Sequence, residues 1–318
     1  MRISFVGKGG SGKSTLTASF ASYLSKNTIK PVVVFDADLN VHVPKLLGFD
    51  APLFNKHLSH PEATKSIKKW LIGKNNITNL GAFRKTTPPT RKSNILNIEK
   101  LNETPLTHFG LQRDNLFLYA VGTYQEEDIG ASCYHNNLAI LESILNHTND
   151  KNGYIVTDMV AGIDSFGGTL HEQFDLTCII VEPTKRSVEV YNKYETLAKE
   201  AGISDSLMVV GNKIRNIQDK EFIEKNIPKE KILGYFNEDI HIREIDQNEA
   251  FLNFKKLDKG NIELLAYIKF KIDSLLDNRQ NRLKKLWGLH KKYVNQDFIR
   301  ERFGDLLEQI DIEFSFDK

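Results

Sequence analysis

Short apolar runs, each followed by glycine or by acidic residues, recur along much of the chain. Residues 2–6 (RISFV) and 32–35 (VVVF) are two such runs, and apolar residues at helical spacing lie between them. Runs of this length are typical of strands that are buried on both faces of a parallel sheet. The order strand, glycine-rich loop, helix and strand predicts the beginning of a βαβ unit.

Later segments extend this sheet. Further apolar runs of strand length are separated by stretches with helical spacing, and they cover residues 116–122, 153–158, 174–181, 207–213 and 232–235. This alternation predicts an α/β fold, here a doubly wound, mostly parallel sheet flanked by helices. We expect the sheet to form one domain over residues 1–255, including an insertion at 51–115 that fits no strand pattern.

Residues 256–318 are expected to form a helical extension packed on that domain. Apolar residues recur there at helical spacing in two groups: Ile262, Leu265, Ile268, Ile272, Leu275 and Leu276, then Leu283, Leu286, Trp287 and Val294. The second group lies among lysines and arginines, and a basic amphipathic helix can also lie on a membrane surface. Acids follow this stretch, which favours a packed helix: Asp297, Glu301, Asp305 and Glu308.

Composition excludes several classes of protein. The chain has 318 residues, of which 40% are apolar and 26% charged, so it can bury a large core and is not expected to be disordered. It has no uncharged apolar run of about 18 residues, and its first apolar run is too short for a signal peptide. Its two cysteines cannot form a disulfide framework, so we expect a reducing compartment and a cytoplasmic protein.

The loop after the first strand has the pattern G-x-x-x-x-G-K-[ST], with Gly7 as its first fixed residue. Glycines let backbone N–H groups surround phosphate oxygens, and the following helix directs its first N–H groups at the same anion. The lysine of this motif reaches the β- and γ-phosphates, and the serine hydroxyl binds Mg²⁺. The motif predicts a phosphate site formed by Gly9, Gly10, Ser11, Gly12, Lys13, Ser14 and Thr15.

A second lysine at the start of the loop makes the motif more specific. Residues 8–15 (KGGSGKST) resemble the deviant Walker A sequence KGGxGK[ST] of the MinD/ParA/CooC group of P-loop ATPases. The resemblance implies a P-loop NTPase fold, ATP and Mg²⁺ as cofactors, and a homodimer with nucleotide at its interface. It also implies that Lys8 reaches the partner's phosphates, where it acts as an arginine finger does. The alternative is an exposed loop lysine without such a role.

Acidic residues follow two of the predicted strands. Residues 36–38 (DAD) resemble the DxD element of the same group, and residues 158–162 (DMVAG) resemble its D-x-x-A-G segment. The resemblance implies that Asp36 and Asp158 lie near Mg²⁺ without binding it directly. It also implies that Asp38 orients the attacking water and that the Gly162 N–H contacts the γ-phosphate. Acids at strand ends can instead cap turns or helices.

Two further segments resemble the base-binding region of the group. Residues 182–184 (EPT) resemble the VxEPT segment of CooC-like proteins, which implies that Pro183 lies near the nucleotide. Asn212 ends a strand where the family has an asparagine that hydrogen-bonds the base, and an amide offers an adenine edge both a donor and an acceptor. Ile214 stands where guanine-binding proteins usually have an aspartate, so ATP is favoured over GTP. The chain after residues 232–235 is expected to pass near the base again.

The two cysteines differ in context. Cys133 and His135 form C-x-H about where CooC-type nickel-insertion ATPases carry C-x-C. Two copies across a dimer would supply two thiolates and two imidazoles, which suits Zn²⁺, but a packing motif before a helix is the alternative. Cys178 lies in an apolar run and is expected to be an inert core thiol. This disfavours an Fe–S cluster, which would need two cluster-ligating cysteines from each protomer.

Charge is distributed unevenly along the chain. Residues 51–100 contain ten lysines and arginines and two acids, whereas the net charge of the whole chain is only +2. Within them, residues 84–93 (RKTTPPTRKS) contain prolines that favour extended backbone. This segment is either a solvated loop, a site for an acidic partner or nucleic acid, or a lid near the phosphates. KTTPP and a later QID (309–311) also resemble a group of bacterial ATP-binding proteins.

The sequence leaves three functions open, because the same nucleotide-binding domain serves different roles. The favoured function is a slow, partner-stimulated ATPase whose ATP-driven homodimer acts on a protein or on a metal centre. The second is a ParA/MinD-like positioning protein that binds DNA or a membrane surface. The third is a metal-insertion chaperone that uses Cys133 and His135.

Overall fold

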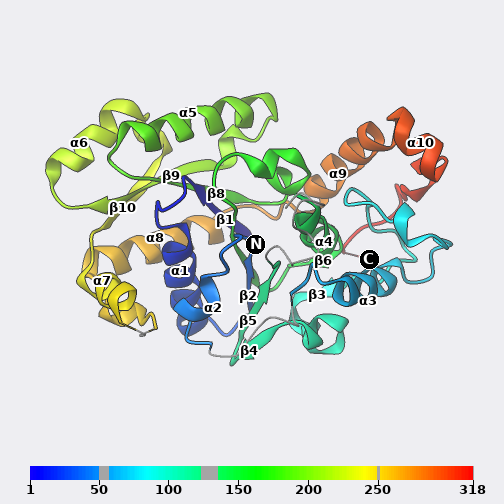
Figure 1. The fold of residues 1–318 in the computed structure, drawn as a ribbon, viewed down its shortest axis with the longest axis horizontal. Coiled ribbons are helices and arrows are strands. Elements are labelled where there is room, and N and C mark those ends of the chain that lie inside the picture. Colours follow the sequence, from blue (N-terminus) through cyan, green and yellow to red (C-terminus); the bar gives the residue numbers. More distant parts are fainter. Residues whose placement is uncertain (50–56, 123–134, 249–250, 318) are drawn as a thin grey trace.

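The computed structural model describes residues 1–49, 57–122, 135–248 and 251–317. Its centre is an eight-stranded sheet with the strand order β10-β9-β8-β1-β7-β2-β5-β4 (Figure 1). All neighbouring strands are parallel except β4 and β5. The strands are β1 (Arg2–Gly7), β2 (Val32–Asp36), β4 (Leu111–Arg113), β5 (Leu116–Ala120), β7 (Tyr154–Asp158), β8 (Leu176–Val181), β9 (Leu207–Ile214) and β10 (Ile232–Asn237). The predicted doubly wound α/β fold is confirmed.

Helices cover both faces of the sheet, which explains the continuous apolar runs. One face carries α1 (Lys13–Asn27), α2 (Val43–Leu46), α7 (Ile240–Gln247) and α8 (Lys259–Asp273). The other face carries α3 (Pro61–Ile72), α4 (His135–Asn146), α5 (Lys185–Glu200) and α6 (Ile217–Asn226). Within β2, Val34 contacts the first set of helices and Val33 belongs to the core of the second, as the alternation of side chains along a strand requires.

The C-terminal helices lie in two places. α8 packs on β10 and α1, and its buried Leu265, Ile268 and Ile272 confirm the first apolar stripe. Leu276 was expected in the same stripe, but α8 ends at Asp273 and Leu276 is 89% exposed. α9 (Arg279–Val294) and α10 (Asp297–Phe303) lie instead beside the insertion, at the far end of the molecule (Figure 1).

α9 is a packed helix, as the acids that follow it suggested. Leu283, Leu286 and Val294 are all buried, and so are its basic residues Arg279 and Arg282. Within the described part of the chain, no helix is both long enough and apolar enough to cross a bilayer.

The insertion contacts the end of the chain. It contains α3 and β3 (Leu96–Asn97), which pairs with β6 (Thr148–Asn149) in a small second sheet. The KTTPP segment follows α3, and its residues from Thr86 to Pro89 are buried, so the expectation of a solvated loop was wrong for them.

Side chains from the end of the chain bind this buried segment. Thr86 Oγ1 lies 2.9 Å from His290 Nδ1, and Thr87 Oγ1 donates to Gln309 Oε1 over 2.9 Å. Arg91 Nε lies 2.9 Å from Asp311 Oδ2. KTTPP and QID, about 220 residues apart in sequence, are therefore in contact. Asp311 of the same chain is thus one acidic partner of the basic segment.

The strand order places a topological switch point at β1. From β1 the chain proceeds to β2 and β5 on one side, returns to β7, and then continues through β8, β9 and β10 on the other side. Ligands of open α/β sheets bind at the carboxyl ends of the strands beside such a point. The glycine-rich loop and the acids Asp36 and Asp158 all lie at these ends.

Candidate functional site

The loop between β1 and α1 has the backbone that a phosphate-binding loop requires. Gly12 precedes the first turn of α1 with φ 94°, in the left-handed region that favours glycine. A Cβ atom at this position would lie 2.2 Å from Nδ2 of Asn212, so a side chain does not fit. The Ser11 N–H donates to the Lys8 carbonyl over 3.1 Å, which closes the turn. The first N–H groups of α1 are thereby directed at the space above the loop.

A cleft of about 880 Å³ lies in that space, a volume suited to a nucleotide. The loop contributes one side, and the ends of β2, β9 and β10 contribute the others. The predicted site residues that line the cleft are Gly9, Gly10, Gly12, Lys13, Ser14, Thr15, Asp38 and Asn212. The loop and the strand ends therefore meet at one place, as the sequence predicted.

Lys13 is nearly fully buried at the base of the cleft. Its Nζ lies 3.8 Å from Asp38 Oδ2 and 3.4 Å from the Lys8 carbonyl oxygen. Asp38 in turn accepts a hydrogen bond of 3.2 Å from the Asn40 N–H, which orients its carboxylate. The buried ammonium is placed to contact phosphate oxygens. The carboxylate beside it is placed to accept a hydrogen bond from a nearby water.

Ser14 and Asp158 form a short polar contact in the site. The Ser14 hydroxyl donates to Asp158 Oδ2 over 2.6 Å, and the Thr17 hydroxyl contacts Asp158 Oδ1 at 3.3 Å. Burial raises the pKa of Asp158 to about 7, although the Ser14 hydrogen bond and the charge of Lys13 oppose this shift. Thr17 was not identified from the sequence, because its only signal is a position one helical turn after Lys13.

Asp36 is fully buried beside Asp158, in register with it across β2 and β7. Its carboxylate accepts hydrogen bonds from the N–H groups of Asp38 (3.2 Å) and Val43 (2.9 Å). Burial, followed by the charge of Asp158, raises the pKa of Asp36 well above its usual value. A divalent cation nearby would relieve this repulsion and favour the ionised form of both acids.

The donor set suits Mg²⁺, which prefers hard oxygen ligands and retains several waters. Ser14 Oγ would bind the ion directly, and Asp36 and Asp158 would contact its waters. Among the described residues, no group of three or more His, Cys, Asp or Glu side chains is arranged to hold a metal ion by itself. Phosphate and water oxygens would therefore have to complete the coordination of the ion.

Gly162 and Pro183 lie close to the site but not on the cleft wall. The Gly162 N–H donates to the Gly7 carbonyl over 3.0 Å, so this hydrogen bond has to break before the amide can contact a phosphate. Pro183 follows β8, just before Thr184, the N-cap of α5. Neither residue is among those that line the cleft.

Asn212 connects β9 to the loop. Its Nδ2 donates to the Ser11 carbonyl over 2.7 Å, which leaves its carbonyl oxygen as the acceptor available to a base. Beside it, Lys213 Nζ lies 2.8 Å from the Gly10 carbonyl and 2.6 Å from Glu182 Oε1. Lys213 and Glu182 lie in predicted motifs, but neither was assigned a role from the sequence. The overlooked signal is a pair of opposite charges at the ends of neighbouring strands.

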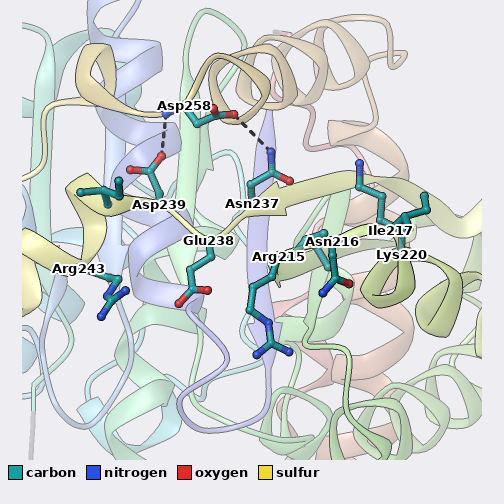
Figure 2. A pocket seen from close by; sticks show the side chains of 11 residues that line it. Arg215, Asn216, Ile217, Lys220, Asn237, Glu238, Asp239, Arg243 and Asp258 are labelled. Carbon is teal, nitrogen blue, oxygen red and sulfur yellow. Dashed lines mark hydrogen bonds between the residues drawn. The ribbon is translucent and has the colours of Figure 1, made fainter.

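A second cleft of about 550 Å³ adjoins the first at the carboxyl ends of β9 and β10 (Figure 2). The residues from Asn237 to Asp239, together with Arg243, line both clefts. The Asp258 N–H donates to Asp239 over 2.7 Å, and Asn237 Nδ2 donates to Asp258 over 3.3 Å (Figure 2). These bonds fix the segment after β10, which borders the nucleotide cleft.

The candidate transition-metal site lies mostly outside the described residues. Cys133 is not among them, and His135 is the first residue of α4. The Cys133–His135 site therefore remains a prediction. Cys178 is fully buried in β8, and burial raises the pKa of its thiol, which fits an inert core residue.

Comparison with known proteins identifies a nucleotide-binding domain, which agrees with the cleft above the phosphate-binding loop. Residues 5–252 match the model of the CobQ/CobB/MinD/ParA nucleotide-binding domain. An uncharacterised ATP-binding protein of Methanocaldococcus jannaschii is 30% identical over 242 residues, which cover 74% of this chain and 84% of that protein. The carbon monoxide dehydrogenase accessory protein CooC of Rhodospirillum rubrum is 27% identical over 248 residues, covering 78% of this chain and 87% of CooC.

Solved structures of low sequence identity share the fold. The cell division ATPase MinD of Pyrococcus furiosus superposes with a TM-score of 0.53 at 20% identity, covering 85% of this chain and 98% of MinD. The matched residues 5–252 contain the loop, the three acids and Asn212, whereas α8, α9 and α10 lie beyond them. The chain belongs to the family of CobQ/CobB/MinD/ParA nucleotide-binding domains.

Proposed function

We propose that the protein is an Mg²⁺-dependent ATPase that forms a homodimer when ATP is bound. One observation carries this proposal: the two lysines of the loop point to different places. Lys13 is buried at the base of the cleft, among the acids. Lys8 is 39% exposed, pairs with Glu182 and does not line the cleft, so it is available to a second protomer.

The remaining residues have complementary roles in this proposal. Lys13 and the loop N–H groups bind the phosphates, and Ser14, with Asp36 and Asp158 behind it, holds Mg²⁺. Asp38 orients the attacking water next to Lys13, and Lys8 of the partner neutralises charge on the γ-phosphate in the transition state. The carbonyl oxygen of Asn212 accepts a hydrogen bond from the amino group of adenine, which favours ATP.

Two lysine variants separate nucleotide binding from dimerisation. We expect Lys13→Ala to abolish ATP binding, because the phosphates lose their buried cation. Lys8→Ala should bind ATP within about twofold of the wild type but should neither dimerise nor hydrolyse at the wild-type rate; loss of a trans cation slows hydrolysis by roughly 10³-fold or more. The measurements are nucleotide titration, analytical ultracentrifugation with a non-hydrolysable ATP analogue, and phosphate release.

Lys225→Ala, an exposed lysine on α6, is the matched control and should behave as the wild type. Wild-type hydrolysis by both loop variants would refute the mechanism. Hydrolysis by a Lys8→Ala monomer would refute only the contribution of the partner.

We further propose that the dimer acts on a protein or on a metal centre. The resemblance to CooC supports this client class, although the Cys133–His135 pair departs from C-x-C. Exposed lysines on α3 and α9 keep binding to DNA or to a membrane surface as the second candidate, and these include Lys65, Lys69, Lys284 and Lys291.

An Asp38→Ala variant, expected to remain in the ATP-bound state, tests the client class. Its dimer should retain a specific protein in pull-down and should not co-sediment with DNA or anionic liposomes. ATP-dependent sedimentation with either would instead support the positioning function. Metal on the ATP-bound dimer that disappears in Cys133→Ser would support the chaperone.

A further inference from the structure

Glu182 contacts two lysines beside the loop, Lys8 and Lys213. It follows β8, and its side chain is only 13% exposed. Its Oε1 lies 2.6 Å from Lys213 Nζ, and its Oε2 lies 3.9 Å from Lys8 Nζ. One carboxylate thus offers one oxygen to each lysine, and the two contacts differ strongly in length.

Lys213 has an unusual backbone that makes its contact possible. Its φ is 58°, in the left-handed region that residues with a side chain rarely adopt, and strained residues of this kind cluster at functional sites. In this conformation the side chain extends over the loop, where Nζ also donates to the Gly10 carbonyl over 2.8 Å. Lys213 therefore joins the tip of the loop to Glu182.

We propose that Glu182 is a positioning residue that holds Lys8 on its own protomer until a dimer forms, and that Lys213 fixes Glu182 in place. This inference rests on the proposed function, because Lys8 has to leave Glu182 to reach the partner's phosphates. The Lys8 contact is long and half-exposed, and pairs of this kind are weak enough to break.

The shorter contact, between Glu182 and Lys213, explains why Lys8 can leave Glu182 for the partner's phosphates. When Lys8 leaves, Glu182 keeps the ammonium of Lys213 on its other oxygen, so no unpaired carboxylate remains beside the phosphates. Glu182 does not line the nucleotide cleft, whereas Lys213 does. Glu182 therefore acts through the two lysines and not by contact with the nucleotide.

The test is the dimer dissociation constant of Glu182→Gln with a non-hydrolysable ATP analogue. Glutamine keeps an acceptor for Lys213 but removes the charge that holds Lys8. We expect dimerisation at a protein concentration roughly two- to fivefold lower than for the wild type, the range that a surface ion pair supplies. Nucleotide affinity of the monomer should stay within about twofold. Glu189→Gln, an exposed acid on α5, should leave dimerisation unchanged.

Two further variants test whether the effect of Glu182 depends on its charge and on Lys8. Glu182→Asp retains the charge but shortens the side chain, so it should give a smaller gain in the same direction. In a Lys8→Ala background, which is not expected to dimerise, Glu182→Gln should not restore dimerisation, because no lysine is left to release. A direct readout is the rate of Lys8 acetylation in the nucleotide-free monomer, which should rise in Glu182→Gln while that of Lys225 stays constant.

The possible failures are distinguishable. An unchanged dissociation constant in Glu182→Gln, with a wild type that dimerises on ATP, overturns this inference and leaves the proposed function intact. A wild type that binds ATP but never dimerises overturns both. Dimerisation of Lys8→Ala that is restored by Glu182→Gln overturns the inference too, since Glu182 would then act on something other than Lys8.

Discussion

At the scale of single residues, His147 is a titratable group whose burial makes stability depend on pH. It is fully buried after α4, with Nδ1 3.0 Å from the Ser143 carbonyl and its ring against Phe83 of the insertion. Burial lowers its pKa from 6.5 to about 4, so the folded protein keeps the ring neutral where the unfolded chain protonates it. Its contribution is therefore complete above pH 6.5 and is lost as pH falls from about 6.5 to 4, by up to about 3 kcal/mol.

Urea unfolding of the wild type and of His147→Gln between pH 4 and 7 measures this contribution. The difference in unfolding free energy between the two proteins should shrink as pH falls. His108→Gln, at an exposed histidine of the insertion, should show no such trend. A difference that stays constant over this range would mean that His147 is not neutral in the folded protein.

At the scale of elements, a buried charge network fixes α9 to the amino ends of the central strands. Arg282 donates to Asp150 over 2.8 Å and also pairs with Asp175, while Arg2 of β1 pairs with Asp150 at 3.0 Å. The two arginines hold the pKa of Asp150 far below its usual value. Arg282→Met should cost about 3–5 kcal/mol of stability, because it leaves the buried carboxylate of Asp175 without its paired cation, whereas Asp150 keeps Arg2.

The urea midpoint of Arg282→Met, read beside that of Lys284→Met, tests this role. Lys284 is an exposed residue of the same helix, so its replacement should change stability by less than about 0.5 kcal/mol. Equal effects of the two substitutions would show that α9 is held by its apolar residues alone.

At the scale of the whole molecule, the insertion and the last residues of the chain hold each other in place. A Gln309→Ala/Asp311→Asn double variant removes side-chain partners of Thr87 and Arg91. We expect tryptic cleavage at the basic residues 84–92 to become several-fold faster, because these peptide bonds become accessible when the local structure opens. Limited proteolysis followed by mass spectrometry measures the rate at each site.

Glu308→Gln is the control for this change, since it neutralises an exposed acid beside Gln309. Cleavage of α6 should be equal in all three proteins. Faster cleavage everywhere would indicate global destabilisation and would contradict a local fastening of the insertion.

The sequence predicted the parts of the site that depend on short segments. The loop, the two strand ends with Asp36 and Asp158, and Asn212 are each readable locally, and parallel strands necessarily bring their carboxyl ends to one edge. Contacts such as Lys213 with Glu182, or Thr86 with His290, join segments that have no common pattern. The buried state of KTTPP could not be predicted for the same reason, because its polar residues are satisfied by a segment about 200 residues later.

The contact between the insertion and the chain's last residues also has a consequence in time. Thr86 and Thr87 cannot meet their partners until more than 200 further residues have been made. At ribosomal speeds of about 5–20 residues per second, that interval is roughly 10–40 s. Most of the central sheet can assemble during it, while the buried threonines and prolines of the insertion stay exposed. The time of greatest risk for aggregation and proteolysis of the insertion therefore falls during synthesis, and it ends only when residues 290–311 have left the ribosome.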